Sequence, residues 1–455
     1  MPPRGAADRL GLTAKRLAGG FSWEVAAAGT AILLQLGYAA YTGRHVTAAH
    51  FGAYATALAI VHFSATFAEG FGQLVLTYSG GRPGQLRRSL LLAGCVGATT
   101  CLLFEAVAPL WGLIWPEVPG LVEFVRLLVL ANLVAPAAAV CTAGLRASLR
   151  FRTAALLELL GQATAMALAL ALLRQGWNPF AIAMPATVGT AVPLLGGLLL
   201  LAPRLRGRGG AEPYRALVRQ LWICTRYTML QSVIFSVPMW LAAAVLGAAG
   251  AGHYSRAFYF ASIMSGVLTN GLSRIAIPAL ARVRDAAEPL GPAIARAHGA
   301  TCLLLAPAVT LMAGLGPMGL VLLLGPGWGQ AAELLPWFLP GLALQVLCVL
   351  GWQIDLVRGD KGGVLRTQAV ALGVMLAAAA AVPALGDARA LALATLPATA
   401  AVHGLQVSRW RRRGLLRLRG WLPAVGRGAA VVPGQHRAPP SAAPPGAPAS
   451  RRTAG

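Results

Sequence analysis

Charge is scarce in this sequence, and acidic charge is the scarcest. Of the 455 residues, 11% are charged: 38 are Lys or Arg and 14 are Asp or Glu. Soluble domains carry about 25% charged residues. A chain this long with so little charge cannot cover a water-soluble globule. The 57% of hydrophobic residues therefore indicates that lipid surrounds most of the chain.

The sequence also lacks the motifs of an enzyme or a metal site. It contains no Walker A motif, no convincing catalytic triad and no cluster with metal-ligand spacing. The six cysteines are Cys95, Cys101, Cys141, Cys224, Cys302 and Cys348. They form no C-x-x-C pair, and we interpret them as buried, reduced thiols. We expect no enzymatic activity, no metal and no cofactor.

Basic residues are in large excess, with a net charge of +24, but their placement argues against nucleic-acid binding. They occur in short clusters between long apolar runs, not on one basic domain. Clusters of this kind orient membrane helices. We expect no nucleic-acid partner.

Twelve apolar runs are long enough to cross a bilayer, for which an α-helix needs about 20 residues. They cover residues 22–41, 51–78, 89–109, 124–144, 154–173, 180–202, 227–249, 258–277, 300–324, 334–353, 367–385 and 388–407. We predict an all-α polytopic membrane protein with about 12 transmembrane helices.

The basic residues alternate between successive connections. Only five lie in or beside the odd-numbered connections: Arg44, Arg126, Arg174, Arg256 and Arg389. The others lie at the two ends of the chain and in the even-numbered connections. Because cytoplasmic loops carry the excess of Lys and Arg, we predict cytoplasmic N and C termini. The expected location is the cell inner (plasma) membrane, with many passes.

The longest basic connection divides the chain into two six-helix bundles. We predict a cytoplasmic N-terminal segment (1–21), a first bundle (22–202), a basic linker (203–226), a second bundle (227–407) and a cytoplasmic tail (408–455). The tail is basic and then rich in Pro and Ala, so it is expected to be disordered. Its Arg409–Arg419 stretch is expected to contact the anionic inner leaflet.

A short motif occurs at the same place in each half. The pattern G-x-Y-x-x-A is found at Gly52–Ala57 and again at Gly252–Ala257, offset by 200 residues. Six helices separate the copies, so both have the same membrane orientation. This indicates a parallel pseudo-two-fold repeat, a transporter plan with the substrate site between the halves.

Three stretches around these motifs resemble a known family. They are Thr47–Leu76, which contains F-G-x-Y and a later Glu-Gly, the basic Leu145–Thr153, and Leu246–Leu280. At these residues the sequence resembles the polysaccharide flippase family of the multidrug/oligosaccharidyl-lipid/polysaccharide exporter superfamily. The likeness runs in order and spacing over residues 22–366.

The sequence departs from the family pattern in two places. Asn270 and Gly271 do not repeat the acidic-Gly of the first half, and the tail is unusually long and basic. The resemblance implies that the protein flips a lipid-linked oligosaccharide from the cytoplasmic to the outer leaflet for cell-surface polysaccharide or lipopolysaccharide biosynthesis. It also implies other polysaccharide-assembly proteins as partners.

Charged residues inside the apolar runs are few, and each needs a reason. A phosphate-bearing head group needs cations, and the planar fork of Arg suits phosphate oxygens. We expect Arg226, Arg256 and Glu69 to form the substrate-binding cavity. The two arginines could instead snorkel to the interface, and Glu69 could bind a coupling cation or pair with an Arg. His62 and His403 are interpreted as core histidines.

Two other functions remain open from the sequence. A cation-coupled small-molecule exporter of the same superfamily would need an acidic cavity with Glu69 facing inward. A non-transporting membrane scaffold of a polysaccharide-synthesis complex would use the Arg-rich tail as its docking site.

Overall fold

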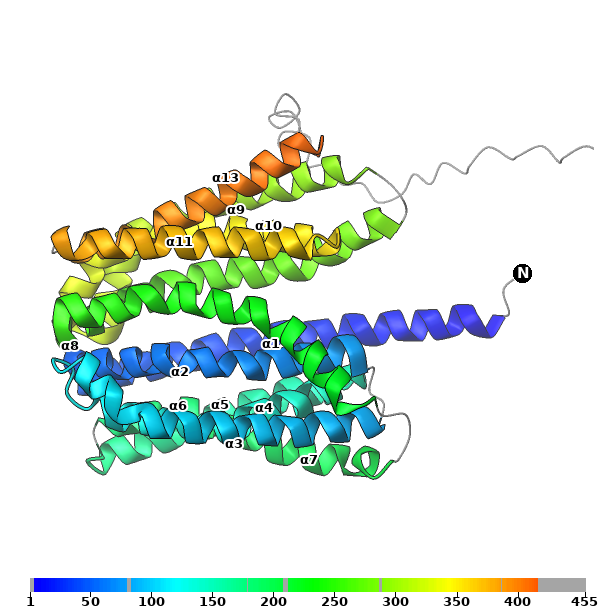
Figure 1. The fold of residues 1–455 in the computed structure, drawn as a ribbon, viewed down its shortest axis with the longest axis horizontal. Helices are drawn as coiled ribbons and strands as arrows, with labels where there is room; N and C mark the ends of the chain where they lie inside the picture. Colours follow the sequence, from blue (N-terminus) through cyan, green and yellow to red (C-terminus); the bar gives the residue numbers. More distant parts are fainter. Residues whose placement is uncertain are drawn as a thin grey trace, which may run out of the picture.

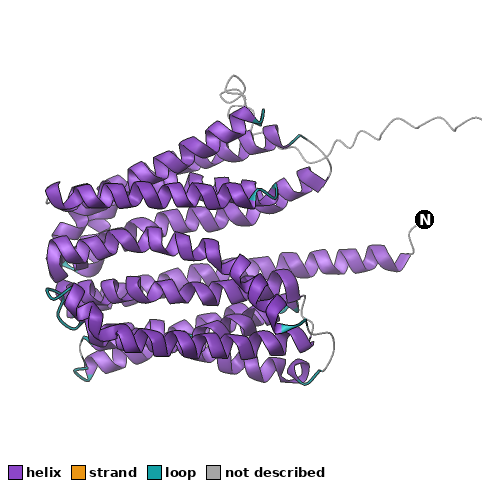
Figure 2. Cartoon of the chain, viewed as in Figure 1, coloured by secondary structure: helices purple, strands orange, loops and turns teal. Residues whose placement is uncertain are grey.

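A computed structural model describes residues 4–79, 83–177, 179–207, 212–285, 289–385 and 387–415. Within these residues every regular element is a helix, as predicted (Figure 2). The C-terminal tail beyond Leu415, including the end of the Arg409–Arg419 stretch, lies outside the described residues.

The helices follow one another with short connections (Figure 1). Those of the first half are α1 (Arg4–His45), α2 (Ala48–Leu74), η1 (Val75–Ser79), α3 (Pro83–Ile114), α4 (Leu121–Ala147), α5 (Phe151–Arg174), η2 (Phe180–Ala183), α6 (Met184–Val188) and α7 (Ala191–Leu205). Those of the second half are α8 (Tyr214–Asp285), α9 (Leu290–Leu324), η3 (Pro326–Trp328), α10 (Gly329–Val357), α11 (Lys361–Leu385), α12 (Ala388–Leu393) and α13 (Thr395–Arg412).

Eleven stretches of the described chain are long and apolar enough to cross a membrane, one fewer than predicted. The difference lies in α8, whose apolar part, Tyr214–Thr269, counts as one stretch of 56 residues. A straight helix of that length would be about 84 Å long, against a hydrocarbon core of about 30 Å. The backbone is non-helical at Gly247 (φ 66°, ψ −175°), a conformation that glycine adopts readily.

Contacts with α2 show that α8 turns back at Gly247. Along the first part of α8, Thr225 lies against Gly70 and Ser236 donates a hydrogen bond to the Ala59 carbonyl. Beyond the turn, Gly252 lies against Ala48, at the start of α2. The first part of α8 therefore runs antiparallel to α2 and the second part returns. Two of the predicted spans, 227–249 and 258–277, lie on this one element.

The last span of each half is divided into shorter helices, and in both halves a proline lies in the first turn of the final one. The sixth consists of η2, α6 and α7, and the twelfth of α12 and α13. Pro193 is the third residue of α7, and Pro397 is the third residue of α13. Proline has no N–H to bond the preceding turn, so it is tolerated in the first turn of a new helix.

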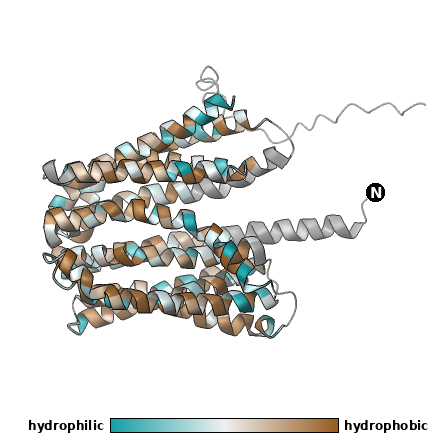
Figure 3. Cartoon of the chain, viewed as in Figure 1, coloured by the Kyte–Doolittle hydropathy of each residue, from teal (hydrophilic) through white to brown (hydrophobic). Residues whose placement is uncertain are grey.

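Two groups of helices are visible in the ribbon, α1 to α7 below and α9 to α13 above, with α8 between them (Figure 1). The largest hydrophobic core joins the two groups, because it contains Phe51 and Phe124 from the first half and Tyr254 and Phe338 from the second. Apolar residues dominate along the helices, while hydrophilic residues gather toward their ends (Figure 3). This distribution is typical of a multi-pass membrane protein.

The two halves touch through backbone where α2 crosses α8. A Cβ on Gly52 would overlap the Ala248 carbonyl, and a Cβ on Gly252 would overlap the Ala48 carbonyl. The contact is reciprocal, since each glycine lies against the residue four positions before the other glycine. Only hydrogen fits at either position.

Two tryptophans link the halves on the same side of the molecule. Trp115, between α3 and α4, donates its indole N–H to the Trp240 carbonyl at 3.1 Å. Trp328, between α9 and α10, donates to the Gly43 carbonyl near the end of α1 at 2.7 Å. Each tryptophan precedes the fourth span of its own half and bonds to the first span of the other half.

We expect Gly52→Ala to lower the thermal unfolding temperature of the purified protein in detergent. Forcing the two backbones apart to admit a methyl group costs about 1–3 kcal/mol. Gly72→Ala is the matched control on α2, since nothing lies within 4 Å of a Cβ there. Equal unfolding temperatures for the two variants would contradict the backbone contact.

Candidate functional site

A cavity of about 310 Å³ lies between the two halves, next to the point where α2 and α8 cross at Gly52 and Gly252. Its walls come from α2, from both parts of α8, and from single residues of α10 and α13. The lining is mainly aromatic and aliphatic, and among its described residues Arg256 is the only Lys or Arg. No Asp or Glu is among the described residues that line it.

Arg256 is placed by the first turns of α8 beyond Gly247. Its guanidinium carbon lies 3.5 Å from the centre of the Phe51 ring, and the phenols of Tyr38, Tyr54 and Tyr259 are its electrostatic neighbours. Its Nε is buried without a hydrogen-bond partner in the described part of the chain. The cation is therefore held by aromatic faces, with no carboxylate to neutralise it.

Helix α1 fixes the tyrosines around this arginine. The Tyr259 hydroxyl donates to the Gln35 side-chain oxygen at 3.3 Å, which joins α8 to α1. The Tyr38 hydroxyl donates to the Ile182 carbonyl at 3.3 Å. These bonds hold Tyr38 and Tyr259 in place and do not involve the Arg256 guanidinium.

Neutral polar groups complete the lining. Ser236, Ser255 and Ser262 each donate to a backbone carbonyl and keep acceptor lone pairs. Gln345 and His62 also line the cavity. A site with one unpaired cation, hydroxyls and an amide suits an anionic or polyhydroxylated ligand.

The sequence matches a family model described as "Polysaccharide biosynthesis protein" over residues 43–333. The chain belongs to this polysaccharide biosynthesis protein family. The family expected from the motifs is confirmed. No curated protein matches the sequence.

Solved structures of low sequence identity share the fold. One is titled as the inward-facing conformation of a multidrug resistance MATE family transporter of the MOP superfamily; it is 13% identical, with 85% of this chain and 95% of that chain covered and a TM-score of 0.68. Another is the lipid II flippase MurJ, inward closed conformation: 11% identical, 89% and 90% covered, TM-score 0.68. A third is a MOP superfamily transporter from Pyrococcus furiosus: 15% identical, 88% and 95% covered, TM-score 0.59. At these identities the likeness shows a shared fold.

Of the three residues expected to bind substrate, Arg256 alone lines the cavity. Arg226 is half-buried on the first part of α8 and is not part of the lining. Glu69 is exposed on α2 and also lies outside the lining. It is two helical turns beyond His62, on the same face, and His62 is its electrostatic neighbour. Glu69 therefore lies near His62, which lines the cavity, and does not line the cavity itself.

The interpretation of the two histidines is corrected in part. His403 is within 3.3 Å of His298, nitrogen to nitrogen, between α13 and α9. His62 instead has an exposed side chain that lines the cavity. A single His in an apolar run has the same sequence pattern whether its side chain packs in the core or lines a cavity. The sequence does not show which face of α2 meets the space between the halves.

The aromatic residues around Arg256 were missed by sequence reasoning. Phe51 and Tyr54 belong to the F-G-x-Y stretch on which the family resemblance rests, and neither was given a role in the site. Tyr259 follows Arg256 by three positions, one helical turn. That spacing is the signal that could have associated an aromatic ring with this cation.

A second arginine is neutralised away from the cavity. Arg146 on α4 binds Glu24 of α1 at 2.9 Å and Glu158 of α5 at 2.7 Å. The partner of Glu158 is thus Arg146, and the three groups join three helices of the first half. This arginine has no free capacity for a substrate.

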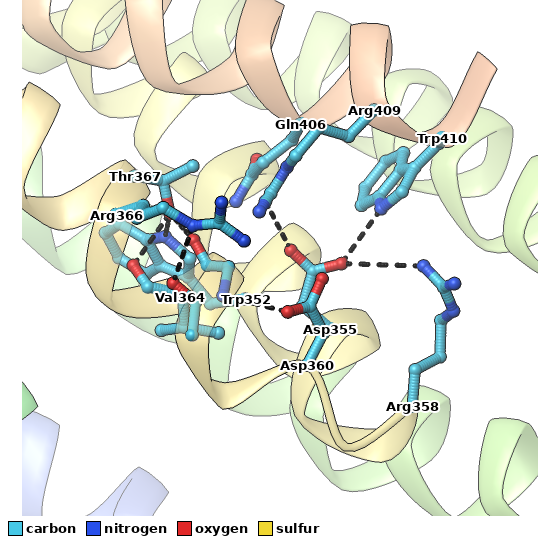
Figure 4. A network of polar contacts seen from close by, with 12 residues as sticks. Trp352, Asp355, Arg358, Asp360, Val364, Arg366, Thr367, Gln406, Arg409 and Trp410 are labelled. Carbon is cyan, nitrogen blue, oxygen red and sulfur yellow. Dashed lines mark hydrogen bonds and ion pairs between the residues drawn. The ribbon is translucent and has the colours of Figure 1, made fainter. Parts of the chain in front are cut away.

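A buried carboxylate holds the end of α13 against α10 (Figure 4). Asp355 is 1% exposed and accepts from Arg409 at 2.6 Å and from the Trp410 indole at 3.1 Å. Arg358 lies 3.9 Å away. The first arginine of the stretch expected to contact lipid therefore binds protein instead.

A second carboxylate, that of Asp360, extends this network into the connection between α10 and α11. Asp360 accepts from Arg413 at 2.8 Å and from the Gly363 N–H. Partial burial acts to raise the pKa of the Asp360 carboxyl, but these two donors hold it below its usual value. Arg411 and Arg412 stay exposed, so they keep the charge that could meet anionic lipid.

We expect Asp355→Asn to destabilise the protein by about 3 kcal/mol, the lower end of the range for breaking a buried ion pair, because Asp355 is buried and Arg409, which would lose its partner, is only partly buried. Thermal unfolding in detergent is the measurement. Glu333→Gln is the control, since the Glu333–Arg389 pair is 4.0 Å apart and exposed and contributes about 0–1 kcal/mol. A shift as small as that of the control would show that Asp355 does not anchor α13.

Proposed function

We propose that this protein flips a lipid-linked oligosaccharide from the cytoplasmic to the outer leaflet, and that Arg256 binds the phosphate of its head group. The observation that carries this proposal is that Arg256 lines the cavity between the halves and that, among the described residues, its Nε has no hydrogen-bond partner. A charge in so apolar a place is costly unless it has a role. An Arg fork matches phosphate oxygens.

The charge of the cavity favours an anionic substrate. One cation without a neighbouring carboxylate attracts phosphate and repels cationic compounds. A cation-coupled exporter would need an acidic cavity, and Glu69, its expected acid, lies outside the lining. Glu69 and Arg226 stay in the proposal as residues near the path of the head group, Glu69 through His62.

The reciprocal contacts between the halves support a two-repeat transporter. Gly52 and Gly252 exchange equivalent backbone contacts, and Trp115 and Trp328 exchange equivalent hydrogen bonds. Paired contacts of this kind are what a two-fold axis along the membrane normal produces. Rocking the halves about the crossing would alternate access to the cavity. A scaffold without transport would not need that cavity.

The proposed orientation makes outward flipping favourable. If both termini are cytoplasmic, the tryptophan-linked side faces outward, because Trp115 and Trp328 lie in odd-numbered connections. An inside-negative potential contributes about 2.3 kcal/mol per charge per 100 mV. An anionic head group moving outward releases that energy, so flipping needs no ATP bound by this chain.

The test is transport of a defined probe by the full-length protein in vesicles. Undecaprenyl diphosphate N-acetylglucosamine, delivered to one leaflet, is scored on the other by its accessibility to an added galactosyltransferase. We expect Arg256→Gln to slow transport at least about tenfold, since a charge-assisted hydrogen bond contributes about 1.5–3 kcal/mol. Arg256→Lys should be intermediate, because it keeps the charge and loses the fork.

Arg219→Gln is the matched control, because Arg219 is exposed on the same helix and should leave the rate unchanged. A wild-type protein that moves a cationic dye and not this probe would refute the proposal. So would an Arg256→Gln variant that transports the probe at the wild-type rate.

A further inference from the structure

A second cavity, of about 420 Å³, lies at the end of the second half that bears Trp328. It is bounded by α8 just beyond Gly247, by the start of α10 and by the start of α12. Its polar lining consists of His253, Gln330, Glu333, Asp387 and Arg389. In the proposed orientation this is the outer face, on the side to which the substrate is delivered.

The polar groups of this pocket are available to a ligand. The Glu333 and Arg389 side chains are 73% and 53% exposed and only loosely paired, at 4.0 Å. Asp387 accepts one bond from the Arg389 backbone N–H through Oδ1, which leaves Oδ2 unused. His253 also lines the pocket, although its Nδ1 is buried, without a hydrogen-bond partner in the described part of the chain.

An exposed aromatic ring adjoins the same groups. The Arg389 guanidinium lies 5.7 Å from the centre of the Trp337 ring, and Trp337 is 40% exposed. An indole next to carboxylate acceptors and guanidinium donors offers both surfaces that a sugar needs. The C–H face of a sugar packs on an aromatic ring, and each sugar hydroxyl can donate and accept a hydrogen bond.

Other classes of ligand fit this pocket less well. Two carboxylates and one guanidinium give it a negative balance, which disfavours phosphate. In the described residues no three His, Cys, Asp or Glu side chains converge to hold a metal ion. A neutral polyhydroxylated ligand remains.

The pocket lies next to the Arg256 cavity. His253 and Arg256 are three residues apart on α8, so their positions differ by about 4.5 Å along the helix. The His253 ring packs edge-on against Trp328, with centroids 5.3 Å apart, and Trp328 is the residue that bonds the first half. A ligand touching His253 would therefore lie beside the link between the halves.

The corresponding position of the first half carries no such group. The residue 200 positions before His253 is Ala53, which is fully buried. The polar pocket is thus a property of the second half and is not imposed by the shared helix packing.

We propose that this pocket is an exit subsite that binds the saccharide of the transported lipid on the outer face. The inference rests on the proposed function and deepens it, because it assigns a separate place to the glycan once the phosphate leaves Arg256. The interaction that defines it is hydrogen bonding of sugar hydroxyls to Glu333, Asp387 and Arg389, beside the exposed Trp337 ring over which the Arg389 guanidinium lies.

Site-specific photo-cross-linking of the full-length protein in cells that make the surface polysaccharide tests this assignment. p-Benzoylphenylalanine replaces Ala388 in the outer pocket, Ser262 in the Arg256 cavity, or Leu113, which is 78% exposed at the same end of α3. After irradiation the denatured protein is treated with periodate and a hydrazide label, which reports any sugar with vicinal hydroxyls.

We expect labelled glycan on the proteins altered at 388 and 262 and none on the protein altered at 113. Glu333→Gln with Asp387→Asn should reduce the adduct at 388 by at least about tenfold and leave the adduct at 262 in place. Arg256→Gln should reduce the adduct at 388 as well, because the subsite is filled by transport.

Results that contradict the exit subsite alone can be distinguished from results that also contradict the flippase. Labelling at 262 without labelling at 388 rejects the exit subsite and leaves the flippase intact, whereas labelling at neither position rejects both. An adduct at 388 that survives Arg256→Gln shows glycan arriving from outside, which also rejects an exit subsite.

Discussion

The closest approach between the two halves is a contact of backbone with backbone, at Gly52 of α2 and Gly252 of α8. Lipid supplies no hydrophobic drive for helices to associate, so small residues that let backbones meet are what holds membrane helices together. Much of the described structure follows from this crossing. It leaves the cavity below it open, it brings Phe51 under the Arg256 guanidinium, and it places each linking tryptophan within reach of the other half.

The architecture was predictable because hydrophobicity alone determines which segments enter a bilayer. Eleven described stretches meet that criterion. The count is one lower than predicted because two predicted spans, on either side of the Gly247 turn, belong to the single element α8. Motif spacing also predicted the Gly52 and Gly252 positions, although their role as the contact between the halves is visible only in three dimensions. The place of Arg256 in the cavity lining agrees with the expectation drawn from the sequence, where a lone cation in an apolar run requires a reason.

Other parts of the site could not be predicted, since they depend on which face of each helix meets the cavity. Asp355 and Arg409 pair across 54 residues of sequence, so the arginines of the last span divide between protein and solvent in a way that a charge count cannot show. Tyr38, Tyr54 and Tyr259 gather around one guanidinium from separate helices. In an apolar sequence a tyrosine that packs and a tyrosine that lines a site have the same neighbours.

The proposed repeat accounts for the matching contacts between the two halves. The residues that we propose to bind substrate are found at positions where the two halves differ. The residue 200 positions before Arg256 is Thr56, whose hydroxyl is buried and bonded to the Gly52 carbonyl at 2.7 Å. The Thr56 hydroxyl thus bonds within its own helix. Arg256 instead lies over the Phe51 ring and lines the cavity between the halves, and its Nε has no hydrogen-bond partner in the described part of the chain. Ala53 and His253 differ in the same way. Two equivalent arginines at the crossing would repel each other across an apolar gap, so a paired scaffold of this kind can hold a cation near its axis in one half only. In the proposed function the second half therefore supplies the cation, Arg256, and the first half supplies the aromatic ring of Phe51 over which it lies.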